Sequence, residues 1–91
     1  GEGAVYADFD EKTQYISNYD PSTITSYYAG LDWGYEHAGA LLVFGDDSHG
    51  NTYLIDEISA KHREIDWWVD QAYRVVKKYG NIRIWADSAR P

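Results

Sequence analysis

The chain has 91 residues, of which 44% are hydrophobic and 25% charged, and its formal net charge is −7. This length allows one domain at most, and the absence of cysteine excludes a disulfide framework and a thiolate metal site. No apolar run approaches the roughly 18 residues that a membrane span requires, and residues 1–3 lead into no signal-peptide pattern. We therefore expect a soluble protein that acts inside the cell.

Residues 1–26 differ in pattern from the rest of the chain. Val5–Asp10 alternates apolar with small or polar residues, and Gln14–Ile16 has the composition of a second short strand. Ser17–Thr23 is rich in turn-forming residues and predicts a loop. We expect residues 1–26 to be a connector that leads into a regular unit over residues 27–91.

Four strands are predicted within that unit. They cover Tyr27–Trp33, Ala38–Gly45, Thr52–Ser59 and Asn81–Asp87. The second run is almost wholly apolar, as is typical of a central strand that is buried on both faces. The third is rich in β-branched and aromatic residues, which favour strands.

Between the third and fourth strands, apolar side chains recur at helical spacing and predict one amphipathic helix. They are Ile65, Trp68, Val69, Ala72, Val75, Val76 and Tyr79. Glu64 and Asp66 in the first turn and Lys77 and Lys78 in the last turn complement the helix dipole. Gly80 follows as a terminating residue that tolerates positive φ.

Two hairpins followed by a helix and a strand predict an α/β fold with a mixed sheet. The helix is the crossover of a βαβ unit, so the fourth strand runs parallel to an earlier one. If that strand is the first, the sheet order is 3-2-1-4 and the fourth strand lies at an edge. Asp32 and Asp87 then meet at the carboxyl ends of neighbouring strands, where open α/β sheets place their sites.

Two carboxylates brought together by a fold repel each other unless a proton or a cation lies between them. Mg²⁺ prefers oxygen ligands, and one or two carboxylates together with a substrate phosphate hold it. The pattern predicts a site in which Asp32 and Asp87 bind two divalent ions, Mg²⁺ or Mn²⁺, and act as catalytic residues. The simpler interpretation is that each aspartate begins a turn or caps a helix.

Glu57 is a further candidate metal ligand. It is expected on the same face of its strand as Tyr53, Ile55 and Ser59, two strands away from Asp32. A structural role for Glu57 is therefore an equal alternative.

Tyr35 and Arg90 are candidates for substrate contact because each follows one of the two aspartates closely. The histidines have no zinc-ligand spacing, and the chain has no glycine-rich phosphate loop. Its acidic balance repels nucleic-acid phosphates at long range, so a surface that grips DNA is expected mostly outside these residues.

Four short motifs occur in an order that resembles the nuclease domain of the large terminase subunit of tailed bacteriophages. They are Gly3–Asp10, Gly30–Gly34, Tyr53–Glu57 and Ala86–Ala89. The resemblance implies a ribonuclease H-like fold, with residues 1–26 joining a packaging ATPase to the nuclease. It also implies a Mg²⁺- or Mn²⁺-dependent endonuclease that cuts concatemeric viral DNA. Asp32 and Asp87 match the family's metal-binding acids, and Glu57 matches a position that is often acidic.

The family further implies double-stranded DNA, the terminase small subunit and the portal protein as partners, and action in the cytoplasm of the infected bacterium. One departure is clear, because the family's third metal-binding carboxylate lies on a later helix, beyond Pro91. We therefore expect the chain to hold the first part of a nuclease domain, residues 27–91, with weak or absent cleavage by itself. Its bare fourth strand is a candidate for self-association.

Two other classes of protein remain alternatives. Actin-like ATPases also begin with a strand that ends in Asp-x-Gly, but they place small hydroxyl residues after the glycine, whereas Tyr35 and Glu36 follow here. A non-catalytic binding module, in which the aspartates only cap turns, is the other. Loss of a metal-dependent change on replacing Asp32 would distinguish a metal centre from such a module.

Overall fold

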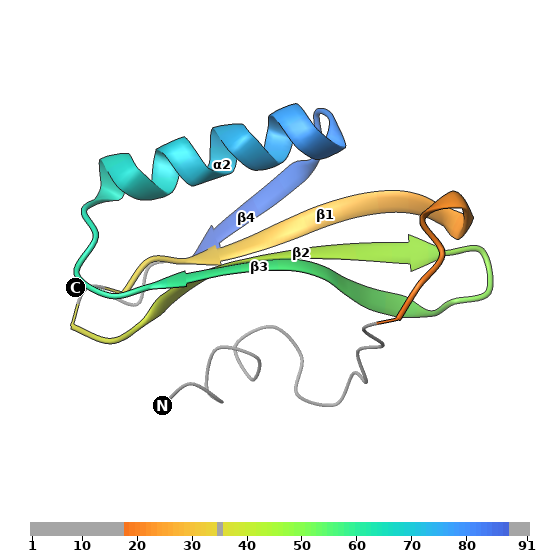
Figure 1. The fold of residues 1–91 in the computed structure, drawn as a ribbon, viewed down its shortest axis with the longest axis horizontal. Helices are drawn as coiled ribbons and strands as arrows, with labels where there is room; N and C mark the ends of the chain where they lie inside the picture. Colours follow the sequence, from red (N-terminus) through yellow and green to blue (C-terminus); the bar gives the residue numbers. More distant parts are fainter. Residues whose placement is uncertain (1–17, 35, 88–91) are drawn as a thin grey trace.

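A mixed four-stranded sheet with one helix on one face makes up the described part of the chain. The computed structural model describes residues 18–34 and 36–87 (Figure 1). The elements are the 3-10 turn η1 (Pro21–Thr23), β1 (Ile24–Asp32), β2 (Gly39–Asp47), β3 (Thr52–Ala60), helix α2 (Ile65–Tyr79) and β4 (Arg83–Asp87). The sheet order is β3-β2-β1-β4, with β4 parallel to β1 and the other neighbours antiparallel. The predicted fold class, strand order and crossover helix are confirmed.

The first strand begins at Ile24 rather than at the predicted Tyr27. The Asp20 carboxylate accepts hydrogen bonds from the backbone N–H and the hydroxyl of Ser22, at 3.0 and 2.9 Å, and so caps η1. The turn therefore ends at Thr23, and Ile24 already pairs with Asp47 of β2. The strands predicted at Val5–Asp10 and Gln14–Ile16 lie outside the described residues.

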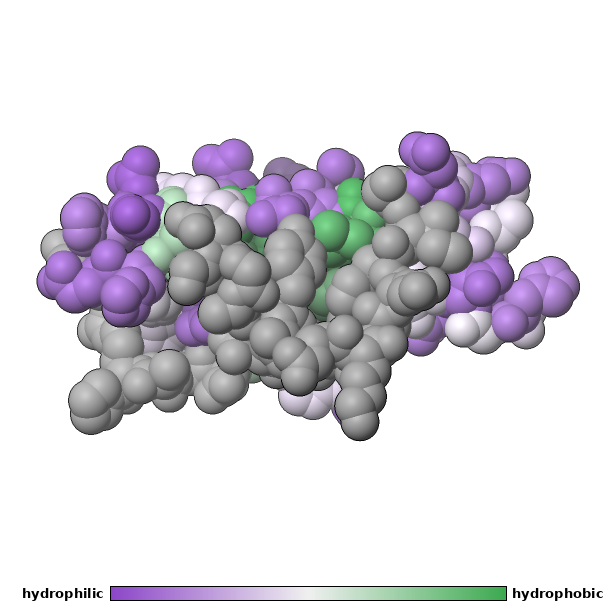
Figure 2. Space-filling view, turned by 90° about the horizontal axis from the view of Figure 1, so that it is seen from below, coloured by the Kyte–Doolittle hydropathy of each residue, from purple (hydrophilic) through white to green (hydrophobic). Residues whose placement is uncertain are grey.

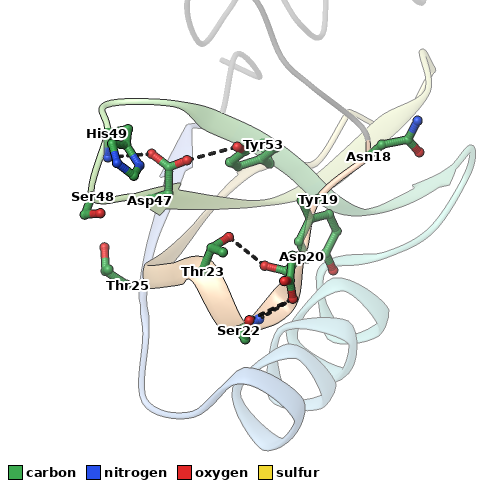
Figure 3. Close-up of a pocket in the computed structure, with 10 residues that line it drawn as sticks. All are labelled: Asn18, Tyr19, Asp20, Ser22, Thr23, Thr25, Asp47, Ser48, His49 and Tyr53. Carbon is green, nitrogen blue, oxygen red and sulfur yellow. Dashed lines mark hydrogen bonds between the residues drawn. The ribbon is translucent and has the colours of Figure 1, made fainter.

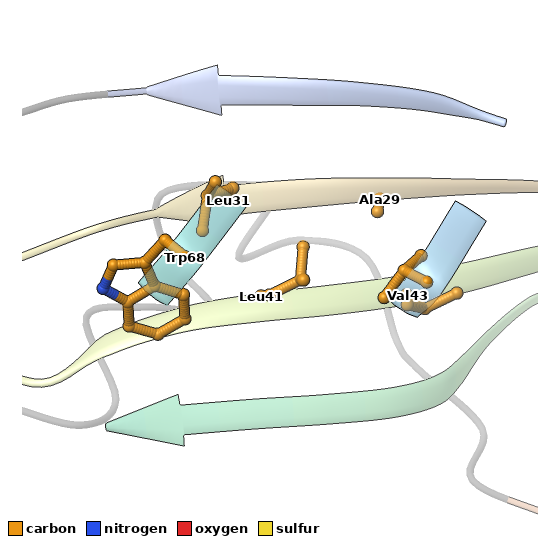
Figure 4. Packing of buried hydrophobic residues seen from close by; sticks show 6 residues of the cluster. Ala29, Leu31, Leu41, Val43 and Trp68 are labelled. Atoms are coloured by element: carbon orange, nitrogen blue, oxygen red, sulfur yellow. The ribbon is translucent and has the colours of Figure 1, made fainter. Parts of the chain in front are cut away.

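The second strand, β2, is one of the two inner strands of the sheet, as its apolar composition predicted. Every residue from Gly39 to Gly45 is buried. On the face toward α2, buried side chains of β1 and β2 pack against Trp68 and Val75 of the helix (Figure 4). Those strand residues are Ala29, Leu31, Leu41 and Val43. The sheet and the helix therefore share one core, which fixes the strand ends on which the site depends.

The opposite face of the sheet has a smaller apolar cluster. Ala40, Leu42 and Phe44 are buried there, and Tyr28 and Leu54 pack against them. In the view from this side, described hydrophobic residues are visible near the middle, and hydrophilic ones lie at the two ends and along the upper rim (Figure 2).

The helix spans Ile65–Tyr79, as predicted, and the Gly80 N–H closes its last turn on the Val76 carbonyl at 2.8 Å. Trp68 and Val75 are buried against the sheet, but Ile65 and Val69 are each 44% exposed. The apolar stripe is therefore wider than the surface that the sheet covers. Among the described residues, no helix has the length and apolar character needed to cross a membrane.

Candidate metal centre

The backbone brings Asp32 and Asp87 together as direct partners. They are the last residues of β1 and β4, and the parallel register pairs them with each other. Both strands point toward the same end of the sheet (Figure 1). Hydrogen-bonded neighbouring strands lie about 4.8 Å apart, so two carboxylate-bearing residues occupy adjacent positions on one edge. The juxtaposition predicted from the sequence is therefore present; of Asp87 the structure describes the backbone.

The core holds the end of β1 in place. Asp32 is partly buried and follows Leu31, whose side chain lies in the cluster around Trp68. Gly39 of β2 packs so closely here that a Cβ added to it would lie 2.7 Å from Trp68 Cζ2 and 2.8 Å from the Asp32 carbonyl oxygen. Because Gly39 admits no larger residue without movement, the main chain at Asp32 is supported by two neighbouring elements.

The register also defines which residues share the face of Asp32. Asp32 pairs with Ala40, and Ala40 pairs with Ser59, so these three positions form one row across the sheet. Alternation along β1 places Asp32 on the face away from α2, because Leu31 packs on the helix side. A ligand held by Asp32 would therefore lie on the face opposite the helix.

Glu57 lies two strands away from Asp32 and opposite Leu42, two residues along the strands from the row of Asp32. Two strand spacings put it on the order of 10 Å from Asp32 across the sheet. Its side chain is exposed, and its Oε2 accepts a hydrogen bond from the Ser59 hydroxyl at 3.0 Å. The described residues contain no group of three or more potential protein ligands that could hold a metal ion. The described site thus consists of the Asp32 and Asp87 positions.

A bulge changes the predicted face of Ile55. The pairing between β2 and β3 shifts between Val43 and Phe44, and Ile55 then packs into the cluster on the helix side. Glu57 and Ser59 pair with Leu42 and Ala40, whose side chains lie on the other face. The prediction that Ile55 and Glu57 share a face was therefore wrong, because the bulge reverses the alternation between them.

The predicted substrate contacts, Tyr35 and Arg90, lie outside the described residues. Two carboxylate positions at adjacent strand ends suit a hard divalent cation, which takes its remaining ligands from water and phosphate. Carboxylates at these two positions are therefore groups that could hold Mg²⁺ or Mn²⁺.

A second polar region, at the other end of the sheet, was not predicted from the sequence. It is a pocket of about 720 Å³ beside η1 and the β2–β3 turn (Figure 3). Its lining residues are Asn18, Tyr19, Asp20, Ser22, Thr23, Thr25, Asp47, Ser48, His49 and Tyr53. The only sequence feature that points to this pocket is the high content of polar turn-forming residues in η1 and in the β2–β3 turn. The pocket was not predictable from them, because it is formed by segments that are distant in sequence.

Asp47 organises this region through hydrogen bonds within the chain. Its carboxylate accepts from the backbone N–H groups of His49 and Asn51, at 2.8 and 2.9 Å, from Asn51 Nδ2 at 3.0 Å and from the Tyr53 hydroxyl at 2.9 Å. Hydrogen bonds from Asn51, foremost that of its backbone N–H, hold the pKa of Asp47 well below its usual range. The carboxylate is thus used to fix the β2–β3 turn, in which Gly50 supplies a φ of 84°.

Acid should weaken the β2–β3 turn through Asp47. A carboxyl whose pKa is lowered by folding stabilises the folded state above its unfolded pKa of about 3.9, and that contribution is lost as the pH falls below this value. We expect Asp47→Ala to lower the urea midpoint at pH 7 and to have a smaller effect at a pH below 3. Ser48→Ala, in the same turn, removes none of the four hydrogen bonds and should show no such pH dependence. An equal effect of Asp47→Ala at both pH values would contradict the assignment.

Comparison with known proteins adds no relative, since no protein-family model, curated protein or solved structure matches this chain. The chemistry of the site is therefore argued from the arrangement of its own residues.

Proposed function

We propose that this chain is part of a metal-dependent DNA endonuclease. The observation that carries the proposal is the pairing of Asp32 with Asp87 at the carboxyl ends of adjacent parallel strands. Like charges placed directly opposite each other in a sheet are destabilising, and a divalent cation bound between them would offset that cost. The resemblance of the sequence motifs to terminase nuclease domains supports the finer assignment to viral DNA packaging.

Asp32 and Asp87 are the residues that would hold the metal ions, with Glu57 too distant in the sheet for direct contact with Asp32. When bound, a pair of Mg²⁺ or Mn²⁺ ions activates water for attack on a phosphodiester and stabilises the leaving oxygen. The two aspartates anchor the site to rigid strands and orient its open side away from α2. A phosphate group would complete the coordination, which makes a nucleic acid the favoured substrate class.

The net negative charge of the chain is consistent with a role in which these residues hold the metal ions and other segments bind the DNA. A net charge of −7 repels DNA at long range, so the surface that grips DNA would belong to other parts of a longer protein or to its partners. In the terminase interpretation, these are the packaging ATPase, the small subunit and the portal protein, acting on double-stranded DNA in the infected bacterium. The actin-like alternative gains no support, because its phosphate-binding hydroxyl residues do not follow Gly34.

Two measurements test the proposal. Calorimetric titration of the 91-residue chain with Mn²⁺ should show binding that EDTA reverses. The longer protein that contains this chain should nick supercoiled plasmid in Mn²⁺ or Mg²⁺ and lose that activity in EDTA. If the chain binds metal but the longer protein does not cleave DNA, the protein is a metal-binding module and not a nuclease. Absence of both metal binding and cleavage from a folded protein would exclude the nuclease.

A further inference from the structure

The first residue of β2 is a glycine that its backbone conformation does not require. Among the described glycines, positive φ occurs at Gly50 and Gly80, and Gly39 does not share it. Glycine weakens a strand because it has no side chain to pack, and it often marks a place where another group approaches the main chain closely. The glycine at position 39 therefore serves to leave space.

Three groups occupy the space that a side chain at Gly39 would need. A Cβ added there would lie 2.7 Å from Cζ2 of Trp68 and 2.8 Å from the carbonyl oxygen of Asp32, whereas ordinary contact begins at 3.4 Å. Its third neighbour is the backbone nitrogen of Gly34, at 3.1 Å. A side chain of α2, the last residue of β1 and the loop after it thus meet at one point of β2.

The ring of Trp68 is held firmly at this point. It is completely buried and lies at the end of the sheet where β1 finishes (Figure 4). Trp67 packs edge-on against it, with ring centroids 4.9 Å apart, and Leu31 belongs to the same cluster. Because protein interiors are close-packed, a buried ring that is held on several sides transmits a displacement to its neighbours. The position of Trp68 is therefore coupled to the position of the main chain at Asp32.

We propose that Gly39 and Trp68 are positioning residues of the candidate metal centre. Trp68 packs into the gap at Gly39, and this contact fixes the main chain of Asp32, from which the carboxylate extends. Metal ligands must be held within about 0.5 Å of the productive geometry, and substitution of the residues that support them typically lowers metal affinity about 10–100-fold. The inference rests on the proposed function, because it assigns a role to residues that support the same site.

This contact links metal binding to the placement of α2 on the sheet. A shift of the helix would move the Trp68 ring relative to Gly39 and so displace the main chain at Asp32. Conversely, an ion bound at Asp32 favours the docked helix, because the coupling between two sites is reciprocal. Mn²⁺ should therefore slow amide hydrogen exchange in α2, although Asp32 lies on the opposite face of the sheet.

Calorimetric titration of the 91-residue chain and its variants with Mn²⁺ tests the inference. Gly39→Ala should raise the dissociation constant for Mn²⁺ by about tenfold or more, because the added methyl group displaces the main chain at Asp32. Gly45→Ala is the matched control at the other end of β2, where an added Cβ would lie 2.9 Å from Cγ2 of Ile24. It crowds the same strand but should leave the dissociation constant unchanged.

A double-mutant cycle assigns the effect to Trp68. Phenylalanine lacks the ring edge that carries Cζ2, so Trp68→Phe makes room for a methyl group at position 39. Gly39→Ala should therefore weaken Mn²⁺ binding less in the Trp68→Phe background than in the wild type. In EDTA, the NMR amide shift of Asp32 should move in Gly39→Ala and return toward the wild-type value in the double variant.

Circular dichroism of each variant verifies that it is folded. If Gly39→Ala does not fold, Trp68→Phe alone tests the support, because it adds no atoms to the core. This variant loses the contact at Gly39 and should bind Mn²⁺ severalfold more weakly than the wild type.

The outcomes separate this inference from the proposed function. Mn²⁺ binding by the wild type that is unchanged in Gly39→Ala, or in Trp68→Phe where only that variant folds, would overturn the inference and leave the metal centre standing. An equal loss in Gly39→Ala and Gly45→Ala would overturn it as well, because the effect would then follow from crowding anywhere in β2. Additive effects in the cycle would remove Trp68 from the role and so also overturn it. Absence of Mn²⁺ binding by the folded wild type would instead refute the metal centre, and any positioning role with it.

Discussion

Under the proposed function, Asp32→Asn is expected to lower the Mn²⁺-dependent nicking activity of a longer protein that contains this chain by about a thousandfold or more. Metal-ion activation supplies several kcal/mol of transition-state stabilisation, and each 1.36 kcal/mol corresponds to a tenfold change in rate. Asparagine keeps the shape of the side chain but removes the negative charge that attracts the cations. Initial nicking rates at saturating metal, compared with those of Asp70→Asn on the exposed face of α2, measure the effect.

The same substitution should also change how Mn²⁺ affects the stability of the fold. In EDTA, replacing one of two adjacent carboxylates removes their mutual repulsion, which favours the folded state of Asp32→Asn. Added Mn²⁺ stabilises a protein that binds it only when folded, by about 2.7 kcal/mol at a concentration 100 times its dissociation constant. Urea unfolding with and without Mn²⁺ should show this gain in the wild type and its loss in Asp32→Asn. A gain that persists in the variant would place the metal elsewhere.

Trp68→Ala is expected to lower the free energy of unfolding by about 3–5 kcal/mol. Trp68 is completely buried, lies edge-on to Trp67 with ring centroids 4.9 Å apart, and fills the space between α2 and the strands. Domains of this size are stable by roughly 5–10 kcal/mol in total, so the loss removes a large fraction of the folded-state margin. Urea unfolding followed by circular dichroism measures it without relying on tryptophan fluorescence.

Trp68→Phe is the informative companion of that variant. The Nε1 of Trp68 is buried and has no hydrogen-bond partner among the described residues. Phenylalanine keeps most of the ring and removes this unsatisfied donor, whose burial costs about 1–3 kcal/mol. We expect Trp68→Phe to cost less than half as much as Trp68→Ala, and Trp85→Ala, at an exposed tryptophan, to cost little. Equal losses for Trp68→Phe and Trp68→Ala would contradict this expectation.

The local pattern of apolar and polar residues was sufficient to predict most of the fold. The spacing of apolar residues between Ile65 and Tyr79 gave the helix its correct bounds, and the apolar run before Gly45 identified the central strand. The handedness and length of the crossover then left few ways to place the last strand, so the pairing of Asp32 with Asp87 was predictable.

Features that depend on contacts between distant segments were not predictable. The bulge that moves Ile55 to the helix side is a property of two paired strands, and no residue in β3 predicts it. The four hydrogen bonds to Asp47 likewise depend on how the turn closes. The exposure of Ile65 and Val69 was also missed, because periodicity shows which side chains of the helix are apolar but not how wide the opposing surface is.

The parallel pairing of β1 with β4 also has a consequence for the order of folding. β1, β2 and β3 are joined by short connections, whereas β2, β3 and α2 all lie between β1 and its parallel neighbour β4 in the sequence. Closing that long loop costs the most chain entropy, so we expect β4 to dock last. Until then Asp32 and Asp87 are apart, and a partly folded chain has no pair of carboxylates to chelate an ion. The proposed metal site would therefore form only when the sheet is complete.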